Sequence, residues 1–313
     1  MSRYLERAGN VARVLDVNFR LMLDLPTGMA VQWGAVVKTT GDYDEFSKRY
    51  KKPTFENVLQ FLTFDRKNPN SILSCICAAR ENARSVREII SSEMWEQVNK
   101  LYLATSDAAE RRLSSPEEFL GDTKLASHLF VGLTDTTMSH GEPWHFARLG
   151  RSLERADKTS RILDIKYFIL LPSATDVGTP LDEIQWTAVL GSASALAMYR
   201  QRHGQVSSKS VIEFLILDRE FPRAIHHCLT DADRSLHAIS GTPLDSFHNV
   251  AEQRLGRLRA DLDFTRVSDI VGGGLHEFID TFQTELNTIS AAIFETFFAF
   301  RRIDGAAAQS PSL

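Results

Sequence analysis

The chain has 313 residues, 43% hydrophobic and 24% charged, which are ordinary values for a soluble globular protein with material for a core. Its formal net charge of −4 argues against nucleic acid or an anionic membrane as a partner. Three cysteines cannot form a paired disulfide framework, which suits a reducing compartment. The chain has no secretory signal at its start and no apolar run of about 18 residues. We therefore expect a soluble, cytoplasmic protein.

The first predicted element is a helix that begins with "RYLERAGNVARVLD" at Arg3. Its apolar positions recur at the helical spacing and form one face, made of Leu5, Ala8, Ala12, Leu15, Phe19 and Met22. The opposite side carries Glu6 and Arg13, yet Val14 and Val17 lie there too. A helix with apolar residues on both sides is buried on both, so its charges must be paired.

This opening segment recurs as "RSLERADKTSRILD" at Arg151, which predicts a second helix of the same kind. Two other segments recur at a common offset of 153 residues: "WGAVV" at Trp33 matches "WTAVL" at Trp186, and "FLTFDRKNPNSI" from Phe61 matches "FLILDREFPRAI" from Phe214. The sequence thus predicts an all-α fold made by tandem duplication, with two helical bundles packed about a pseudo-twofold axis. We place the first repeat at residues 1–140, the second at residues 141–302 and a disordered tail at residues 303–313.

The charges of the two motif helices have two interpretations. In the first they form a structural ion network, in which Arg13 pairs with Asp16 and Arg161 pairs with Asp164 within each helix. In the second, four residues line a cleft between the repeats and recognise the amine and carboxylate of a substrate: Glu6, Arg7, Glu154 and Arg155. The spacing favours the structural network. In that network Glu6 and Glu154 are buried and each contacts an arginine.

A further predicted helix contains "RENARSVRE", whose spacing places Arg80, Arg84 and Arg87 along one stripe. The second repeat has other residue types at these places, namely Asp233, His237 and Ser240. One interpretation is a solvated helix face with an internal pair between Arg84 and Glu88. The other is a site for a carboxylate, a phosphate or an acidic partner surface, with three neighbours: Glu81, Asn82 and Trp95.

Later segments show helix starts. "SSPEEFL" predicts a helix capped by Ser115, and "GTPLDEI" predicts another that begins near Pro180. "EPWHFARLG" supplies two helical turns before Arg151, whereas only Met1 and Ser2 precede Arg3, so we expect either a start upstream of Met1 or a shortened first helix.

No combination of residues indicates a metal or a cofactor. The histidines at 140, 145 and 226 and the cysteines at 75 and 77 have spacings that point their side chains in different directions on a helix. The glycines of "VGGGLHEF" lack the lysine and the spacing of a phosphate-binding loop. We predict neither metal nor cofactor.

The paired "LERA" motifs, the segment "ARENARSVREIISSEMWEQVN" and "GLHEFIDTFQ" resemble the alpha-E family, a bacterial all-α domain named for its Glu-Arg motif and commonly duplicated in tandem. The resemblance covers almost the whole chain. It assigns the Glu-Arg pair to Glu6 and Arg7, and again to Glu154 and Arg155. The gene context of the family implies a peptide-synthesis or peptide-modification system with circularly permuted ATP-grasp ligases and transglutaminase-like proteins.

Two functions follow as alternatives. The first is a non-catalytic accessory component that binds such a ligase or presents its peptide substrate, and the absence of a nucleotide-binding motif or an evident nucleophile in the sequence favours it. The second is an enzyme of peptide or amide chemistry that uses the Glu-Arg cleft.

Overall fold

The computed structural model describes the chain except for residues 25–30, 112–114, 170–177 and 300–313, so the predicted tail lies outside the described residues. The described residues form helices and no strand, which confirms the predicted all-α fold. The first seven helices are α1 (Ser2–Asp24), α2 (Trp33–Lys38), α3 (Tyr43–Arg49), α4 (Phe55–Thr63), α5 (Ile72–Ser85), α6 (Ser92–Glu110) and α7 (Pro116–Thr137). The remaining helices are α8 (Glu142–Phe168), α9 (Pro180–Ser192), α10 (Leu196–Arg202), α11 (Ser208–Leu217), α12 (Ile225–Ser240), α13 (Val250–Phe264), α14 (Val267–Gly273) and α15 (Leu275–Phe297).

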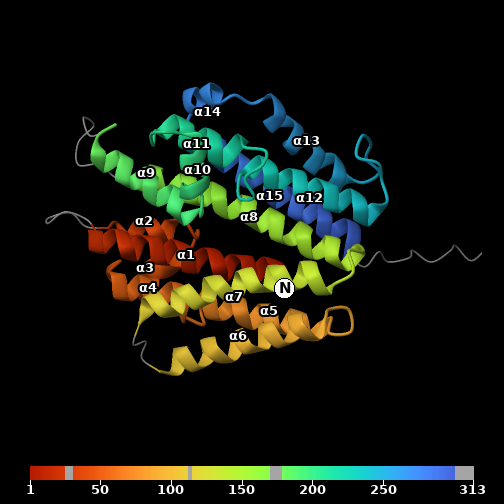
Figure 1. The fold of residues 1–313 in the computed structure, drawn as a ribbon, viewed down its shortest axis with the longest axis horizontal. Coiled ribbons are helices and arrows are strands. Elements are labelled where there is room, and N and C mark those ends of the chain that lie inside the picture. Colours follow the sequence, from red (N-terminus) through yellow and green to blue (C-terminus); the bar gives the residue numbers. More distant parts are fainter. Residues whose placement is uncertain (25–30, 112–114, 170–177, 300–313) are drawn as a thin grey trace, which may run out of the picture.

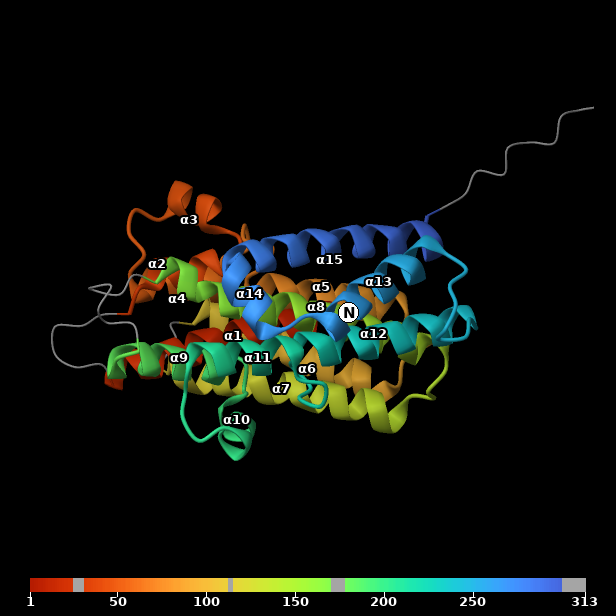
Figure 2. The same cartoon turned by 90° about the horizontal axis from the view of Figure 1, so that it is seen from above.

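The helices are arranged in two groups that meet at α1 and α8 (Figure 1). Helices α1 to α7 lie on one side of this boundary and α8 to α15 on the other. Helix α1 packs against α5 and α7, and α8 packs against α12 and α15. The two groups also cross-contact, because α9 packs on α1 while α2 packs on α8. Seen from above, α3 and α10 project on opposite sides of the molecule (Figure 2).

The same contacts recur in both groups at an offset of 153 residues. The ring of Phe46 meets that of Phe61 edge-on at 5.2 Å, and Tyr199 meets Phe214 at 5.6 Å. Ion pairs recur in the same way, between Arg49 and Asp65 and between Arg202 and Asp218. Such recurrences are expected of a duplicated unit. Residue 140, the predicted boundary, lies between the end of α7 at Thr137 and the start of α8 at Glu142.

Helix α1 is buried because both of its sides are covered. Leu5 and Leu15 on its predicted apolar face are 2% and 1% exposed, and Val14 on the other side is 8% exposed. Helix α7 approaches closely at Gly9, where a β-carbon would lie 2.6 Å from Ser127 Oγ. Glycine at this position therefore permits the α1–α7 packing.

The predicted helix starts are found in the structure. Ser115 Oγ accepts a hydrogen bond from the Glu118 backbone at 3.2 Å and caps α7, and α9 begins at Pro180. Gly274, with φ of +94°, separates α14 from α15 within the predicted glycine-rich entry. Helix α8 extends from Glu142 through the motif at Arg151, whereas α1 begins at Ser2.

Candidate functional site

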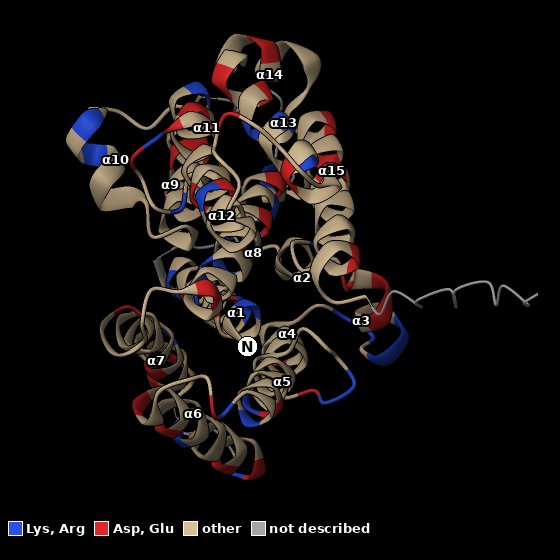
Figure 3. Cartoon of the chain, turned by 90° about the vertical axis from the view of Figure 1, so that its right-hand side faces the viewer, with Lys and Arg blue, Asp and Glu red and all other residues tan. Residues whose placement is uncertain are grey.

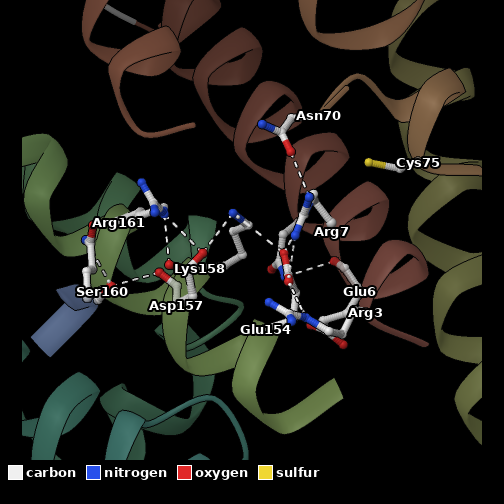
Figure 4. A network of polar contacts seen from close by, with 12 residues as sticks. Arg3, Glu6, Arg7, Asn70, Cys75, Glu154, Asp157, Lys158, Ser160 and Arg161 are labelled. Carbon is white, nitrogen blue, oxygen red and sulfur yellow. Dashed lines mark hydrogen bonds and ion pairs between the residues drawn. The ribbon is translucent and has the colours of Figure 1, made fainter. Parts of the chain in front are cut away.

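The two Glu-Arg motifs face each other across the contact between α1 and α8 (Figure 4). Arg7 of α1 binds Glu154 of α8, and Arg155 of α8 binds Glu6 of α1. The two pairs are thus reciprocal, with each motif supplying one carboxylate and one guanidinium. Glu6 is 4% exposed and Glu154 is 0% exposed, which confirms the prediction that both are buried and that each contacts an arginine.

The Glu154 carboxylate is held by two arginines and a lysine. Arg7 donates from Nε to Oε1 at 2.6 Å and from Nη2 to Oε2 at 2.9 Å, so this contact is bidentate. Arg3 Nε donates to Oε2 at 3.2 Å, and Lys158 Nζ lies 3.6 Å from Oε1. Both carboxylate oxygens are therefore occupied by cations.

The Glu6 carboxylate is held in a similar way, and one of its partners lies just before the start of a third helix, α12. Arg155 donates from Nη2 to Oε2 at 3.0 Å and from Nε to Oε1 at 3.3 Å. Arg223, just before α12, donates from Nη1 to Oε1 at 2.8 Å, and Asn10 Nδ2 donates to the same oxygen at 3.1 Å. Glu6 thus joins α1, α8 and the start of α12.

The arginines keep both carboxylates ionised although burial alone would do the opposite. For each glutamate desolvation is the largest influence on the pKa and raises it. The combined attraction and hydrogen bonds of the basic groups outweigh it, so the pKa of Glu6 lies well below its ordinary value and that of Glu154 is also lowered. Ionised, fully bonded carboxylates are poorly suited to act as general acids near neutral pH.

A second layer of polar side chains fixes the first. Arg7 Nη1 donates to Asn70 Oδ1 at 2.8 Å, and Asn70 Nδ2 donates to the carboxylate of Asp42 at 3.0 Å. On α8, Arg161 Nε donates to both oxygens of Asp157 at 3.0 Å. Lys158 and Arg161, together with their hydrogen bonds, hold the pKa of Asp157 below its ordinary value despite burial.

The network borders a cavity of about 20 Å³, lined by Arg7, Asn70, Lys158 and Arg161 among others. A cavity of this size holds roughly one water molecule. In place of the predicted substrate cleft, the side chains of Glu6, Arg7, Glu154 and Arg155 are bonded to one another between α1 and α8.

The predicted pairs within each helix are wrong. Asp16 accepts hydrogen bonds from Lys124 at 2.5 Å and from Arg20 at 3.3 Å, rather than from Arg13. Arg161 pairs with Asp157, and Asp164 is bonded by His276 Nδ1 at 2.7 Å. Lys124 and His276 come from other helices, whereas Arg161 and Arg20 pair within their own helices with the aspartate four residues earlier.

Arg13 is the exceptional cation of the network. It is 3% exposed, and its Nη1 donates to the neutral Asn10 Oδ1 at 2.7 Å. Burial and the nearby Arg223 lower the pKa of Arg13 to about 9, while Glu6 acts in the opposite direction. The Glu6 end of the network thus brings two buried arginines, Arg13 and Arg223, and the partly buried Arg155 around one carboxylate.

The predicted arginine stripe on α5 is present only in part. Arg80 donates to Asn99 Oδ1 at 2.7 Å and lies 4.5 Å from the centroid of the Tyr102 ring. The side chain of Arg84 is 68% exposed and pairs with Glu81, so the predicted pair with Glu88 is wrong. Because α5 ends at Ser85, Arg87 leaves the helical stripe and lies 5.2 Å from the Trp95 ring.

At the corresponding places in the second half, Asp233 and His237 are 4% and 5% exposed, so they are part of the interior. Arg259 Nε lies 3.0 Å from Asp233, and His237 Nδ1 contacts the backbone oxygen of Thr242 at 3.2 Å. The surface made by the side chains of Arg80, Arg84, Arg87, Trp95 and Tyr102, which we call the arginine surface, therefore belongs to the first half.

Cys75 and Cys228 are buried and make local contacts. Cys75 Sγ lies 3.7 Å from the Pro69 oxygen and Cys228 Sγ lies 3.4 Å from the Pro222 oxygen, a further recurrence at 153 residues. Burial raises the pKa of both thiols to about 12, so neither is a reactive thiolate. Among the described residues no group of three metal-binding side chains comes together.

The sequence analysis missed several residues of the network, which are Asn10, Asn70, Lys158, Asp157 and Arg223. For two of these residues the sequence did contain a signal, which is their matching position in the repeated segments. Asn70 in "NPNSI" and Arg223 in "FPRAI" occupy matching positions after a proline, and both reach the α1–α8 contact.

The fold and site define an all-α protein with paired Glu-Arg motifs at the contact of its two central helices. Residues 1–298 match the Alpha-E family, described as a predicted alpha-helical domain with a conserved ER motif, and the chain belongs to this family. No solved structure matches the chain.

Relatives include uncharacterized proteins of Mycobacterium bovis and of Mycobacterium tuberculosis. Each of these two proteins is 26% identical over 269 residues, which cover 77% of this chain and 29% of the relative. The chain therefore matches less than a third of the length of these longer proteins. Among the described residues, no helix has the length and apolar character needed to cross a membrane.

We predict that Glu6→Ala and Glu154→Ala each lower the free energy of unfolding by roughly 3–5 kcal/mol, because each breaks ion pairs whose carboxylate is buried. Glu45→Ala is the matched control. Its carboxylate pairs with Lys48 at an exposed position, so the loss should be much smaller than in the two motif variants. Urea unfolding at pH 7 measures all three, and equal losses would contradict the burial argument.

The same variants test the ionisation state. Because the folded-state pKa of each glutamate is lowered, the unfolded chain binds more protons in acid, and the stability that the pair contributes is lost as the pH falls below about 4.5. The difference in stability between the native protein and Glu154→Ala should therefore shrink between pH 6 and pH 3.5. A difference that stays constant or grows would show that Glu154 is not held ionised.

We also predict that Arg13→Met leaves the free energy of unfolding unchanged or raises it by about 1 kcal/mol, since methionine fills the site without a buried charge. Arg155→Met should lower it by roughly 3 kcal/mol, because Glu6 loses its bidentate partner. Urea unfolding at pH 7 compares the two. If Arg13→Met lowers the free energy of unfolding as much as Arg155→Met does, the cost of burying the Arg13 charge is fully offset by its neighbours, and the prediction is wrong.

Proposed function

We propose that this Alpha-E chain is a non-catalytic accessory component that binds a partner protein, or the peptide that the partner acts on, through the arginine surface. The partners implied by the family resemblance are a circularly permuted ATP-grasp ligase and transglutaminase-like proteins. The proposed setting is a peptide-synthesis or peptide-modification system in the bacterial cytoplasm.

The observation that carries this proposal is the contrast between two sets of arginines. Arg7 and Arg155 of the Glu-Arg motifs are bonded to buried carboxylates, and Arg7 borders a water-sized cavity. On the arginine surface, by contrast, Arg84 and Arg87 are exposed. Arginine beside aromatic rings is typical of protein interfaces, and a guanidinium binds a carboxylate or phosphate in a bidentate manner.

The longer relatives support an accessory role. In the mycobacterial proteins the matching region makes up 29% of the chain, so an Alpha-E region there lies beside several hundred other residues. A domain that lies beside other regions is suited to binding a neighbouring catalytic domain. Its charged surface then provides specificity and orientation.

The test is Arg84→Glu, in a strain from which the gene has been deleted. Reversing this charge should abolish complementation and the co-purification of the ligase or the transglutaminase-like protein. The fold should be preserved, because an exposed pair such as Arg84–Glu81 contributes at most about 1 kcal/mol. Circular dichroism provides the check on folding.

The matched control is Arg234→Glu, which makes the same charge change at an exposed position of α12. His237, the counterpart of Arg84, is unsuitable because it is buried. Full complementation and normal co-purification by Arg84→Glu would refute the proposal. A folded Glu154→Gln variant that fails to complement while still co-purifying would instead favour the alternative, an enzyme that uses the Glu-Arg residues.

A further inference from the structure

The two motif helices differ around Arg13 of α1 and Arg161 of α8, which occupy matching positions 148 residues apart. Arg161 Nε donates to both oxygens of Asp157, so its charge is paired. At the position that corresponds to Asp157, α1 has Gly9, where a β-carbon would lie 2.6 Å from Ser127 Oγ. The close approach of α7 therefore excludes from α1 the carboxylate that pairs with Arg161 in α8.

Arg13 has a neutral partner instead. It is 3% exposed, and within the described residues its hydrogen bond runs from Nη1 to Asn10 Oδ1, at 2.7 Å. Arg223, which is 8% exposed, donates from Nη1 to the same amide oxygen at 3.1 Å and to Glu6 Oε1 at 2.8 Å. Two buried guanidinium groups therefore meet at one uncharged oxygen. A buried cation is costly unless an anion neutralises it.

Each of these two arginines has one edge without a hydrogen bond. Within the described residues both donate only from Nη1, which leaves Nε and Nη2, a pair of nitrogens that binds an oxyanion side-on. Among the described arginines, the fully buried nitrogens that lack a partner belong to Arg49 and Arg259. The Nε and Nη2 atoms of Arg13 and Arg223 therefore reach solvent.

The positive charge of this pair extends to the surface of α7. The side chain of His128 on α7 is exposed, and its pKa is lowered first by partial burial and then by the charges of Arg13 and Arg223. Burial and Arg223 lower the pKa of Arg13 itself to about 9, so Arg13 stays protonated at pH 7. The local field is thus positive although the whole chain has a net charge of −4, and such a field attracts an anion.

We infer that Arg13 and Arg223 bind a phosphate group, either as free inorganic phosphate or as the end of a larger molecule. A phosphate group provides at least about three acceptor oxygens for the two arginine edges, whereas a carboxylate provides two. It carries about 1.5 to 2 negative charges at pH 7 and so balances two guanidinium groups more fully than a carboxylate does. The inference goes beyond the proposed function, because it concerns the interior of the network instead of the arginine surface.

The test is isothermal titration calorimetry of the full chain with sodium phosphate at pH 7 and constant ionic strength. The native chain should bind one phosphate, and Arg13→Met should bind it at least about tenfold more weakly, because one charge-assisted bidentate contact is lost. Arg13→Lys keeps the charge but lacks the paired nitrogens, so it should also weaken binding, and it takes the place of Arg13→Met if that variant does not fold. Circular dichroism checks the fold.

The matched control is Arg84→Met, which removes an exposed arginine of the arginine surface and should bind phosphate as the native chain does. Binding that is lost in Arg84→Met and kept in Arg13→Met would place the phosphate on the arginine surface and overturn the inference. Absence of binding by the native chain, or equal binding by the native chain and folded Arg13→Met, would also overturn it. Complementation by Arg84→Glu tests the proposed function separately, so either proposal can fail alone.

Glycerol 3-phosphate and acetate, titrated in the same way, distinguish the sources of the anion. Binding of both inorganic phosphate and glycerol 3-phosphate, weakened in Arg13→Met, would support a site for the phosphate end of a larger molecule. Binding of inorganic phosphate without glycerol 3-phosphate would support a site for the free ion. Acetate that binds as tightly as phosphate would overturn the assignment to a phosphate group.

Discussion

The structure depends on a reciprocal pair of buried ion contacts, Arg7 with Glu154 and Arg155 with Glu6, between its two central helices. A buried carboxylate needs cations or hydrogen-bond donors at its oxygens, and the arginine that makes the bidentate contact comes from the other central helix in each case. The α1–α8 contact is therefore specified by charge as well as by apolar packing. Figure 3 shows the basic residues of these helices at the boundary between the two groups.

This constraint explains why the motif letters recur with their charges. An apolar face alone would permit several relative positions of two bundles, whereas a bidentate contact permits one. The same constraint removes the motif from the surface, so the proposed recognition of a partner is assigned to other residues. The arginine surface lies in the first half, and its counterparts in the second half, Asp233 and His237, are interior.

The sequence predicted much of the fold because apolar spacing and helix caps are local signals. The helical nature of the chain, the Ser115 cap and the burial of Glu6 and Glu154 all follow from it. The partners within the site were harder to predict. Arg13 and Arg161 were assigned to carboxylates one turn away, yet Asp16 is bonded to Lys124 of α7. Arg223 joins Glu6 across 217 positions, and no spacing rule relates two such residues before the chain has folded.

The central claim is that the two halves are held by the coupling of each Glu-Arg pair, and a double-mutant cycle measures it directly. Glu154→Gln, Arg7→Gln and the double variant would be unfolded in urea at pH 7, and the interaction energy taken from the four stabilities. The account predicts a coupling of at least about 1.5 kcal/mol, in the upper part of the range for contacting residues. A coupling below about 0.5 kcal/mol, typical of residues that do not interact, would contradict it.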